Sequence, residues 1–345
     1  MVHDVIVVGA GIAGLSLSRE LRANGRAPLV LERARGVGGR CATRRIEGQP
    51  VDHGLAFLHG HSPRFLEELA VTRDAETIAD WPRAREGTGV PCQPEAFSGV
   101  DTRIAPVAGV SSFAKQLARG LDVRLETRVE ALRIAAQSSA RTGRTWEVGL
   151  ASGARLEAKV LALTMPAPSV VALVRGMDPS ADELSALLPL LELVRVLPCL
   201  TVIARYPAGT PAPPWEASHP RASASIHTIL HDSSKRAGVP RLILVIQARP
   251  RFSQAQLGSS VESWTRTLLE EAAALHGEWV NTPDLVQSHV WRNARVAAGS
   301  ELTGPLVTRS DGGIVLGIAG DGLHEVGGVE GAYLSGMALA ARLLE

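Results

Sequence analysis

The sequence predicts an α/β protein made of two interleaved domains. Three observations indicate this fold class: a continuous β-branched run from Val5 to Val8, a glycine-rich turn directly after it, and a second short strand that ends at Glu32. An apolar run without alternation is typical of a parallel strand covered on both faces. The length of 345 residues exceeds that of most compact single domains, so we expect a second domain.

The composition is that of an ordinary globular protein and excludes several classes of partner. Hydrophobic residues make up 45% and charged residues 21% of the chain, a balance that favours a folded core. Lysine and arginine (36) nearly equal aspartate and glutamate (35), so no overall field attracts nucleic acid or an anionic membrane. We therefore expect neither as a partner.

Cysteine usage and the N-terminus favour a cytoplasmic location. Cys41, Cys92 and Cys199 are odd in number and far apart, which fits neither a disulfide framework nor a zinc site. The chain enters a strand at His3 to Val8 without the pattern of an export signal. The most apolar later stretch, 184–204, contains charged residues and prolines, so it predicts a short helix followed by a buried strand instead of a membrane span.

The turn after the first strand has the spacing of a dinucleotide-binding motif. Gly9 permits the tight turn, Gly11 lets the backbone approach a pyrophosphate, and Gly14 lets the following helix pack against the strand. The helix starts near Gly11 and ends at Asn24-Gly25, and its N-terminus would stabilise the phosphates. A glycine-rich turn with a purely structural role is the alternative.

An acid at the end of the second strand completes this motif. The strand Pro28 to Leu31 leads into Glu32, whose carboxylate can accept hydrogen bonds from both ribose hydroxyls. The same carboxylate would repel a 2′-phosphate, which disfavours NADP in this site. The motif alone leaves FAD and NAD open.

The next residues, Gly38-Gly39-Arg40, resemble the GG motif of the flavin amine oxidase superfamily. The resemblance implies FAD as the cofactor, with both glycines near the pyrophosphate and the arginine holding the cofactor. It also implies that Ala13 and Arg33 line the FAD site. A flexible basic surface loop is the alternative.

Within the superfamily the sequence is most similar to renalase and its bacterial relatives. The shared features are an RG-x-GGR arrangement and an acidic-x-Gly-x-x-aromatic stretch, matched by Arg35, Gly36, Gly38, Gly39, Arg40, Asp52, Gly54 and Phe57. The resemblance implies that the backbone at Ala56 and Phe57 lies against the flavin. Leu55 and Ala56 replace the Ala-Gln usual in the family, which changes the wall that faces the substrate.

A second match covers residues 106–134 and resembles the family's helix and returning strand. It implies that the backbone amide of Val129 meets the adenine. Strands at Thr145 to Leu150 and Lys159 to Met165 would complete a small sheet and cross into another domain.

A third match lies at the C-terminus, where a buried strand from Ile314 to Ala319 leads into Gly320-Asp321. The resemblance implies that Asp321 contacts the ribityl or pyrophosphate part, and that backbone N–H groups near Val329 face the flavin O2 edge. A helix N-terminus there would stabilise the negative charge of the reduced flavin. The final helix is expected to bury residues at helical spacing, namely Val329, Ala332, Tyr333, Gly336, Met337, Ala340 and Leu344.

These matches predict a Rossmann-type GG-motif FAD-binding domain interleaved with an α+β substrate domain, the amine-oxidase or p-hydroxybenzoate-hydroxylase-like architecture. The expected FAD-binding domain comprises 1–58, 102–165 and 285–345, and the substrate-binding domain comprises 59–101 and 166–284. In the latter we expect strands at Leu193 to Tyr206, Ala222 to His231 and Arg241 to Ala248, and a helix at Ser260 to His276.

Three side chains are candidates for catalysis beyond the flavin. His324 lies in the loop beside the expected flavin site, although a lone histidine there is more often incidental. Trp291 and Arg292 precede the return to the FAD domain and could border the substrate, while core packing explains Trp291 equally well. His53, His59 and His61 have poor spacing for a metal, so no metal is expected.

The leading hypothesis for function follows from the renalase resemblance. It implies an oxidase that moves a hydride from an isomeric dihydronicotinamide nucleotide to non-covalent FAD, with O2 reoxidation giving H2O2 and NAD(P)+. Covalent attachment is not expected because no cysteine follows Asp321. The alternatives are an FAD-dependent amine oxidase or desaturase of a small metabolite, and a non-catalytic flavin-binding protein. With only Tyr206 and Tyr333 in the chain, a paired-tyrosine cage for an amine is not expected.

Overall fold

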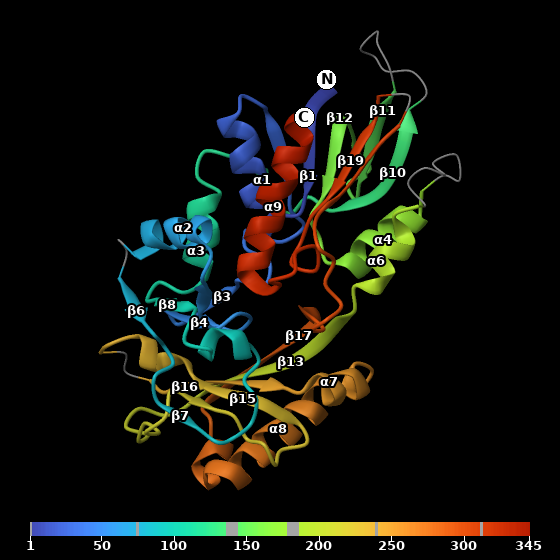
Figure 1. Ribbon diagram of the computed structural model, residues 1–345. Coiled ribbons are helices and arrows are strands. Elements are labelled where there is room, and N and C mark those ends of the chain that lie inside the picture. Colours follow the sequence, from blue (N-terminus) through green and yellow to red (C-terminus); the bar gives the residue numbers. More distant parts are fainter. Residues whose placement is uncertain (1, 74–75, 136–143, 178–185, 239–240, 311–312) are drawn as a thin grey trace. The chain divides into compact units, whose positions relative to one another are not determined.

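The computed structural model describes residues 2–73, 76–135, 144–177, 186–238, 241–310 and 313–345 (Figure 1). The chain forms two compact units, each assembled from separate stretches. Unit 1 comprises Met1–Gly39, Phe113–Val196 and Arg295–Glu345, and unit 2 comprises Arg40–Ser112 and Leu197–Ala294. The functional division expected from the sequence assigns 40–58, 102–112 and 285–294 to the FAD domain and 166–196 to the substrate domain. That division differs from the compact units and stays a prediction.

Unit 1 is built on a sheet whose described strands follow the order β10-β11-β12-β1-β2-β9, with β19 beside β12 and β18 beside β19. β1 pairs in parallel with β2 and β12, and β12 with β19. The elements are β1 (Val2–Val8), α1 (Ile12–Ala23), β2 (Pro28–Leu31), α3 (Ser111–Leu117), β9 (Asp122–Arg124), β10 (Val129–Ala135), β11 (Thr145–Leu150), β12 (Arg155–Leu163), α4 (Ala167–Arg175), α6 (Leu188–Leu193), β18 (Leu306–Arg309), β19 (Val315–Ile318) and α9 (Gly328–Leu344).

The parallel strands of unit 1 are buried as their apolar sequences predict. Val5 to Val7 are fully buried, and side chains of β1, β2, β12 and β19 share one core with α4 and α6. The predicted strand Pro28 to Leu31 and the helix end at Asn24 are confirmed. The stretch 186–204 forms the short helix α6 followed by the buried strand β13 (Val196–Arg205), as expected.

The first and last helices of unit 1 lie side by side (Figure 1). Gly336 makes this close approach possible, because a Cβ at this position would overlap the carbonyl oxygen of Ala13 and the hydroxyl of Ser16. The expected buried face of α9 is right for most positions and wrong at its end. Met337 is half-buried and Leu344 is exposed, while Leu339 and Leu343 are buried instead. Leu339 and Leu343 share the buried side because residues four apart lie on the same face of a helix.

Unit 2 contains a sheet with the strand order β17-β13-β16-β15-β14-β7, a β3-β4 hairpin and a small β5-β8-β6 sheet. Its helices and strands are β3 (Thr43–Ile46), β4 (Gln49–Asp52), β5 (Leu58–Gly60), α2 (Pro63–Arg73), β6 (Thr77–Ala79), β7 (Arg85–Glu86), β8 (Thr102–Pro106), β13 (Val196–Arg205), β14 (Ala217–Ser218), β15 (Ile226–His231), β16 (Ile243–Ala248), α7 (Pro250–Gln256), α8 (Val261–His276) and β17 (Leu285–Val296).

The amphipathic helix α8 covers one face of this sheet. Trp264, Leu268 and Ala272 of α8 pack into one buried core with Leu200 and Val202 of β13. Ser260 caps the helix, since its hydroxyl accepts a hydrogen bond from the Ser263 N–H, so the predicted helix is confirmed. The three predicted strands are present with shorter N-terminal ends. In the described part of the chain, no helix is long and apolar enough to cross a membrane.

Candidate functional site

The glycine-rich turn of unit 1 has the geometry that its spacing predicts. Gly9 has a φ of 109°, and its N–H donates to Leu31 O over 2.8 Å. A Cβ on Gly14 would overlap Gly9 O, so only glycine lets α1 approach the turn. Gly11 is the N-cap of α1 and supplies no side-chain cap, which leaves the N-terminal N–H groups of the helix available to an anion.

Glu32 is fixed at the end of β2, beside this turn. Its Oε2 accepts a hydrogen bond from the Ala10 N–H, and its Oε1 accepts one from the Ala34 N–H, both over 2.8 Å. The carboxylate is 9% exposed. Two backbone donors therefore hold one acid where the sequence predicts the ribose contact.

The GG motif folds against the same turn. Gly38 and Gly39 have φ values of 111° and 56°, and the Gly38 N–H donates to Ala10 O over 2.8 Å. Gly39 lies next to Gly11, since a Cβ on Gly39 would lie in van der Waals contact, 3.7 Å, with the Cα of Gly11. Ala13 is buried in the first turn of α1, whereas Arg33 is exposed. The structure thus brings both predicted glycine motifs together.

The predicted C-terminal residues cluster where β19 leads into α9. Asp321 is 7% exposed and Val329 is 6% exposed, and the Gly320 N–H before them donates to Ser335 Oγ. The loop ends at Gly327, and α9 starts at Gly328; both glycines have positive φ. His324 lies in this loop, where its Nδ1 accepts from the Val326 N–H over 3.3 Å. Val129, the expected adenine contact, begins β10 and pairs with Leu150.

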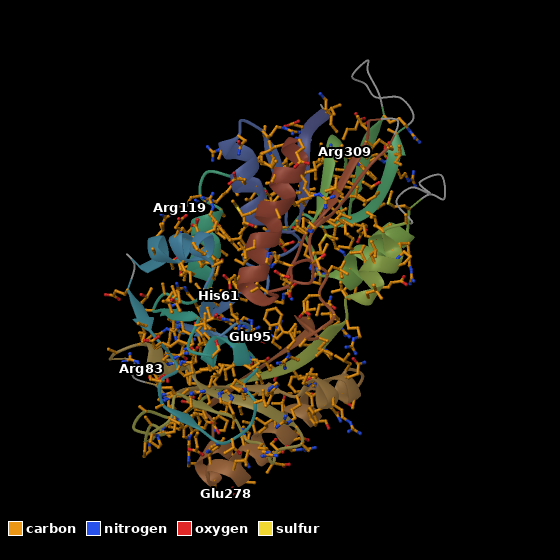
Figure 2. All side chains as sticks on the ribbon, in the orientation of Figure 1. His61, Arg83, Glu95, Arg119, Glu278 and Arg309 are labelled. Atoms are coloured by element: carbon orange, nitrogen blue, oxygen red, sulfur yellow. The ribbon has the colours of Figure 1, made fainter. Side chains whose placement is uncertain are left out.

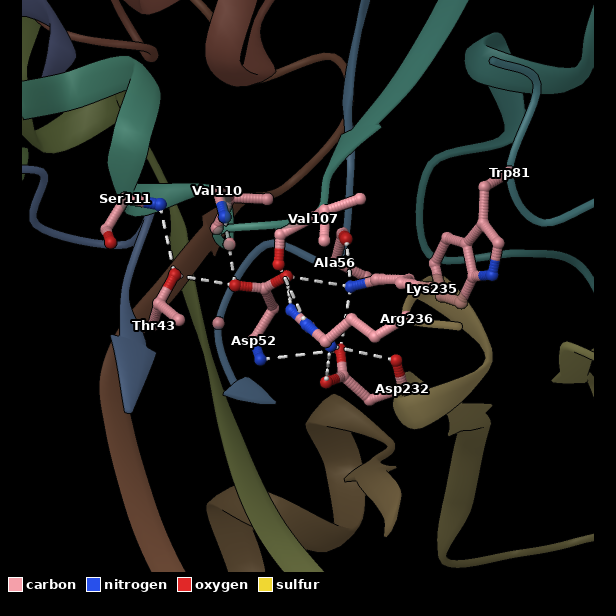
Figure 3. Close-up of polar contacts among 12 residues, drawn as sticks. Thr43, Asp52, Ala56, Trp81, Val107, Val110, Ser111, Asp232, Lys235 and Arg236 are labelled. Carbon is pink, nitrogen blue, oxygen red and sulfur yellow. Dashed lines mark hydrogen bonds and ion pairs between the residues drawn. The ribbon is translucent and has the colours of Figure 1, made fainter. Parts of the chain in front are cut away.

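In unit 2, Asp52 anchors the segment that follows β4 through a buried ionic network (Figure 3). Lys235 Nζ donates to Asp52 Oδ2 at 2.9 Å and to Asp232 Oδ1 at 2.7 Å. Arg236 donates to Asp232 Oδ2 at 2.7 Å and to Asp52 Oδ2 at 3.3 Å. The two acids and Lys235 are fully buried, so the charges compensate each other inside the protein.

The network also holds the backbone that the resemblance places at the flavin. Lys235 donates its third hydrogen bond to Ala56 O over 2.6 Å and lies 4.4 Å from the centre of the Trp81 ring. Asp52 Oδ1 accepts from Thr43 Oγ1 and from the Val110 N–H. Phe57 is 4% exposed and contacts Trp81 edge-on. Through these contacts Asp52 fixes the start of the segment that leads to Ala56 and Phe57.

Gly54 allows three segments of the chain to approach one another closely. A Cβ there would overlap Arg40 O and would lie 3.0 Å from the Trp291 ring. Arg40 O accepts from the Leu55 N–H, so the arginine of the GG motif is tied to the 52–57 segment. Gln247 Nε2 donates to Gly54 O, and Trp291 Nε1 donates to His53 O. Trp291 thus supports this segment, while Arg292 is exposed.

The sheet face of unit 2 opposite α8 carries a polar row. On β17, Ser288 contacts Thr265 of α8 and Val290 packs into the helix-covered core. Because side chains alternate along a strand, the intervening residues face the other way. Thr201, Gln247 and Thr228 pair across three neighbouring strands. We define the polar row as Thr201, Thr228, Gln247, Gln287, His289 and Trp291.

Three aromatic rings cluster at the β17 end of the polar row. The His53 and His289 ring centres are 5.1 Å apart, and each lies within 5.4 Å of the Trp291 ring centre. Burial, with nearby Arg44, lowers the pKa of His53 to about 4. Burial also lowers the pKa of His289. Both imidazoles are therefore neutral at neutral pH.

Of the sequence's other histidines, His59 and His61 share Asp101 and do not gather with His53. His59 Nδ1 lies 2.6 Å and His61 Nδ1 2.9 Å from the two Asp101 oxygens. Figure 2 labels His61, which is 46% exposed. Within the described ranges, no cluster of three or more His, Cys, Asp or Glu side chains is placed to hold a metal ion.

Sequence reasoning missed the partners of Asp52 and the polar row. Three charged residues follow a buried strand, namely Asp232, Lys235 and Arg236. This pattern predicts a charged turn, but it does not show which residues pair with it. Lys235 and Asp52 are 183 residues apart, and charge type alone does not pair distant residues. The i, i+2, i+4 spacing of Gln287, His289 and Trp291 is the one local signal that could have found the polar row.

The glycine turn, the buried Glu32 and the GG motif define a dinucleotide-binding α/β protein of the flavoprotein type. Comparison with known families agrees with this class. The chain belongs to the family of flavin containing amine oxidoreductases, whose sequence model matches residues 75–344. The model for the NAD(P)-binding Rossmann-like domain matches residues 7–69. Membership of this family makes FAD the cofactor of this chain.

Individual relatives match only in part. Putrescine oxidase of Kocuria rosea is 39% identical over 113 residues, 33% of this chain and 23% of that protein. Nicotine dehydrogenase of Pseudomonas putida is 39% identical over 67 residues, 19% of this chain and 14% of that protein. The chain thus matches less than a quarter of the length of either relative.

Solved structures share the fold along the whole chain. A putrescine oxidase bound to putrescine has a TM-score of 0.69 at 16% identity, covering 100% of this chain and 99% of that one. Cyclohexylamine oxidase from Brevibacterium oxydans IH-35A has a TM-score of 0.69 at 14% identity and covers 100% of both chains. The fold is therefore that of the amine oxidases.

The residues of unit 1 fit FAD. A carboxylate held by two backbone N–H groups, an uncapped helix N-terminus and two positive-φ glycines form a cradle for ribose and pyrophosphate that any Cβ at Gly14 would disturb.

Proposed function

We propose that this protein is a renalase-like oxidase, which takes a hydride from an isomeric dihydronicotinamide nucleotide. FAD supplies the two-electron chemistry when bound. In the overall reaction, one dihydronicotinamide donor, one proton and one O2 are converted to NAD(P)+ and H2O2. Residues of this chain bind the cofactor, orient the donor and exclude water.

One observation carries this proposal: the strands that bear the polar row contain no acidic residue. Neither Asp nor Glu occurs in β13, β15, β16 or β17, all of which the structure describes. A cationic amine is usually met by a carboxylate or an aromatic cage. Instead the row offers hydroxyls, amides, neutral imidazole and indole, which suit a neutral ring that carries polar groups.

Both tyrosines of the chain support the same conclusion, because neither is placed to form a cage. Tyr206 is fully buried, and its hydroxyl donates to Val280 O over 2.9 Å inside the core beneath α8. Tyr333 is 4% exposed in α9, where its carbonyl accepts from Ser16 Oγ. A pair of tyrosines that clasps an amine is therefore disfavoured.

An FAD-dependent amine oxidase or desaturase is the second candidate. The family match and the fold shared with putrescine oxidase and cyclohexylamine oxidase favour it. The same residues of unit 1 would hold FAD in either case, so only the electron donor separates the two reactions.

Anaerobic mixing of the FAD-loaded protein with candidate donors tests the proposal. Dihydronicotinamide nucleotides with the hydride at ring position 2 or 6 should bleach the flavin within seconds, while putrescine and cyclohexylamine should leave it yellow. Admitting O2 should restore the colour and release one H2O2 per donor. Bleaching by amines alone would overturn the proposal in favour of the second candidate.

A further inference from the structure

Arg44 of β3 is a half-buried cation whose described neighbours do not balance its charge. Its Nη1 donates to the neutral Gln287 Oε1 over 2.8 Å. Among the described residues, Arg44 forms no ion pair with a carboxylate. Burial lowers the pKa of Arg44, which shows that the fold places this charge at a cost.

The other buried cations of unit 2 show how this chain normally compensates such charge. Lys235 and Arg236 share Asp52 and Asp232 between them. The β3-β4 hairpin contains two acids, Glu47 and Asp52. Glu47 pairs with Arg205 at 2.7 Å, and the oxygens of Asp52 accept from Lys235, Arg236, Thr43 and the Val110 N–H. The acids of the hairpin therefore pair with other cations, and the positive charge of Arg44 can pair with a bound anion.

His53 lies near Arg44, because its ring contacts His289, two residues along β17 from the Gln287 that Arg44 contacts. His53 also has an unused polar atom. Its ring is 6% exposed, and its Nδ1 is buried without a hydrogen-bond partner in the described part of the protein. A buried polar atom in this condition is rare and points to a missing partner. The His289 ring contacts the His53 ring edge-on. Burial, together with nearby Arg44, lowers the pKa of His289.

We propose that Arg44, assisted by His53 and His289, binds an anionic group of the electron donor, either a phosphate or a carboxylate. Arg44 can form a forked hydrogen bond to such a group, and a neutral imidazole can donate one N–H to it. This inference rests on the proposed function and narrows its substrate to donors that carry an anion. A dinucleotide or mononucleotide phosphate and an amino-acid carboxylate share that chemistry.

The experiment compares Arg44→Gln with its neighbour Arg45→Gln in the FAD-loaded protein. Arg45 is exposed on the same strand and donates to Gly48 O, so it is a matched control. Donors are used in pairs that differ by the anion: 6-dihydronicotinamide mononucleotide against its riboside, and phenylalanine against phenethylamine. The dissociation constant of each donor comes from the concentration dependence of anaerobic flavin reduction. Calorimetric titration with inorganic phosphate and with acetate measures anion binding without turnover.

Arg44→Gln should raise the dissociation constant of the anionic member of the accepted pair about 10- to 100-fold and leave the other member unchanged. Arg45→Gln should change neither. Arg44→Lys, which keeps the charge and loses the fork, should give an intermediate effect, and it replaces Arg44→Gln if that variant does not fold. The pair of donors that reduces the flavin shows whether the bound anion is a phosphate or a carboxylate.

The inference and the proposed function fail in different ways. If phenylalanine reduces the flavin and the dihydronicotinamides do not, the proposed function falls and Arg44 is still tested on the carboxylate. If no donor reduces the flavin, loss of the phosphate and acetate titrations in Arg44→Gln supports the site. Equal effects of Arg44→Gln on both members of a pair, or unaltered anion titrations, overturn it.

Discussion

At the scale of single residues, Lys235 shows what a compensated buried charge contributes. Its ammonium group donates to two carboxylates and to Ala56 O and is fully buried. Methionine would fill the space but leave Asp52 and Asp232 with less positive charge than they need. We expect Lys235→Met to lower the free energy of unfolding by about 3–5 kcal/mol, because removing one partner leaves buried charge unpaired.

Urea unfolding followed by tryptophan fluorescence measures this loss. Lys115→Met, at an exposed position of α3, is the control and should change stability by less than about 0.5 kcal/mol. A loss below about 1 kcal/mol in Lys235→Met would show that the two carboxylates find compensation from Arg236 alone.

Glu32 acts at the same scale on the cofactor. Glutamine can accept from only one of the two N–H groups that Glu32 holds, and its amide would oppose the other donor. We expect Glu32→Gln to raise the dissociation constant of FAD about 10-fold or more, since each charged hydrogen bond contributes about 1.5–3 kcal/mol. Titration of the apoprotein with FAD measures this. Glu130→Gln, exposed on β10, should bind FAD as the parent does.

At the scale of secondary-structure elements, the contact between α1 and α9 joins the two ends of the chain. Ser16 Oγ donates to Tyr333 O over 3.0 Å, and Gly336 leaves room for α1. Gly336→Ala should cost about 1–3 kcal/mol by overpacking. It should also weaken FAD binding, because α1 begins at the glycine turn. Thermal melting with and without FAD measures both effects.

Gly304→Ala is the control for this element, since no atom lies within 4 Å of a Cβ placed at Gly304. It should melt as the parent does. If Gly336→Ala melts at the parent temperature, then α9 shifts freely along α1, and the two helices do not fix the glycine turn.

The individual elements also show which parts of the fold can be predicted from the sequence and which cannot. β2 and α1 were predictable because their signals are local: apolar runs, glycine spacing and Asn24-Gly25. The buried face of α9 was predicted one residue off at Leu344, since periodicity does not show where neighbouring elements end. The ionic network was not predictable, because Asp52 and Lys235 meet only through the fold.

At the scale of the whole molecule, buried histidines give the two units different responses to acid. In unit 2, burial lowers the pKa of His53 and His219 to about 4 and also lowers the pKa of three others, His231, His276 and His289. In the unfolded chain a histidine titrates near 6.5. The unfolded state therefore binds more protons between pH 6.5 and 4, so the stability of unit 2 is present above pH 6.5 and falls across this window.

The size of this effect separates it from ordinary acid denaturation. At about 1.4 kcal/mol for each pKa unit, His53 and His219 would each remove of the order of 3 kcal/mol by pH 4. Carboxylates with lowered pKa values, such as Glu271, lose their contribution only as the pH falls below about 4.5. The range from pH 6.5 to 5 therefore reports mainly the histidines.

Hydrogen exchange of the FAD-loaded protein, corrected for the intrinsic pH dependence of exchange, tests this prediction within one sample. Peptides from β16 of unit 2 should lose protection from pH 6.5 to 5, while peptides from β12 of unit 1 should keep theirs, because the strongly buried histidines belong to unit 2. His219→Gln should flatten the response of β16, since it removes one proton acceptor of the unfolded state. His61→Gln, at a side chain that is 46% exposed, should leave the response unchanged. Equal loss of protection in β12 and β16 would mean that the two units unfold together, and a flat profile in β16 would mean that its histidines are protonated in the folded protein.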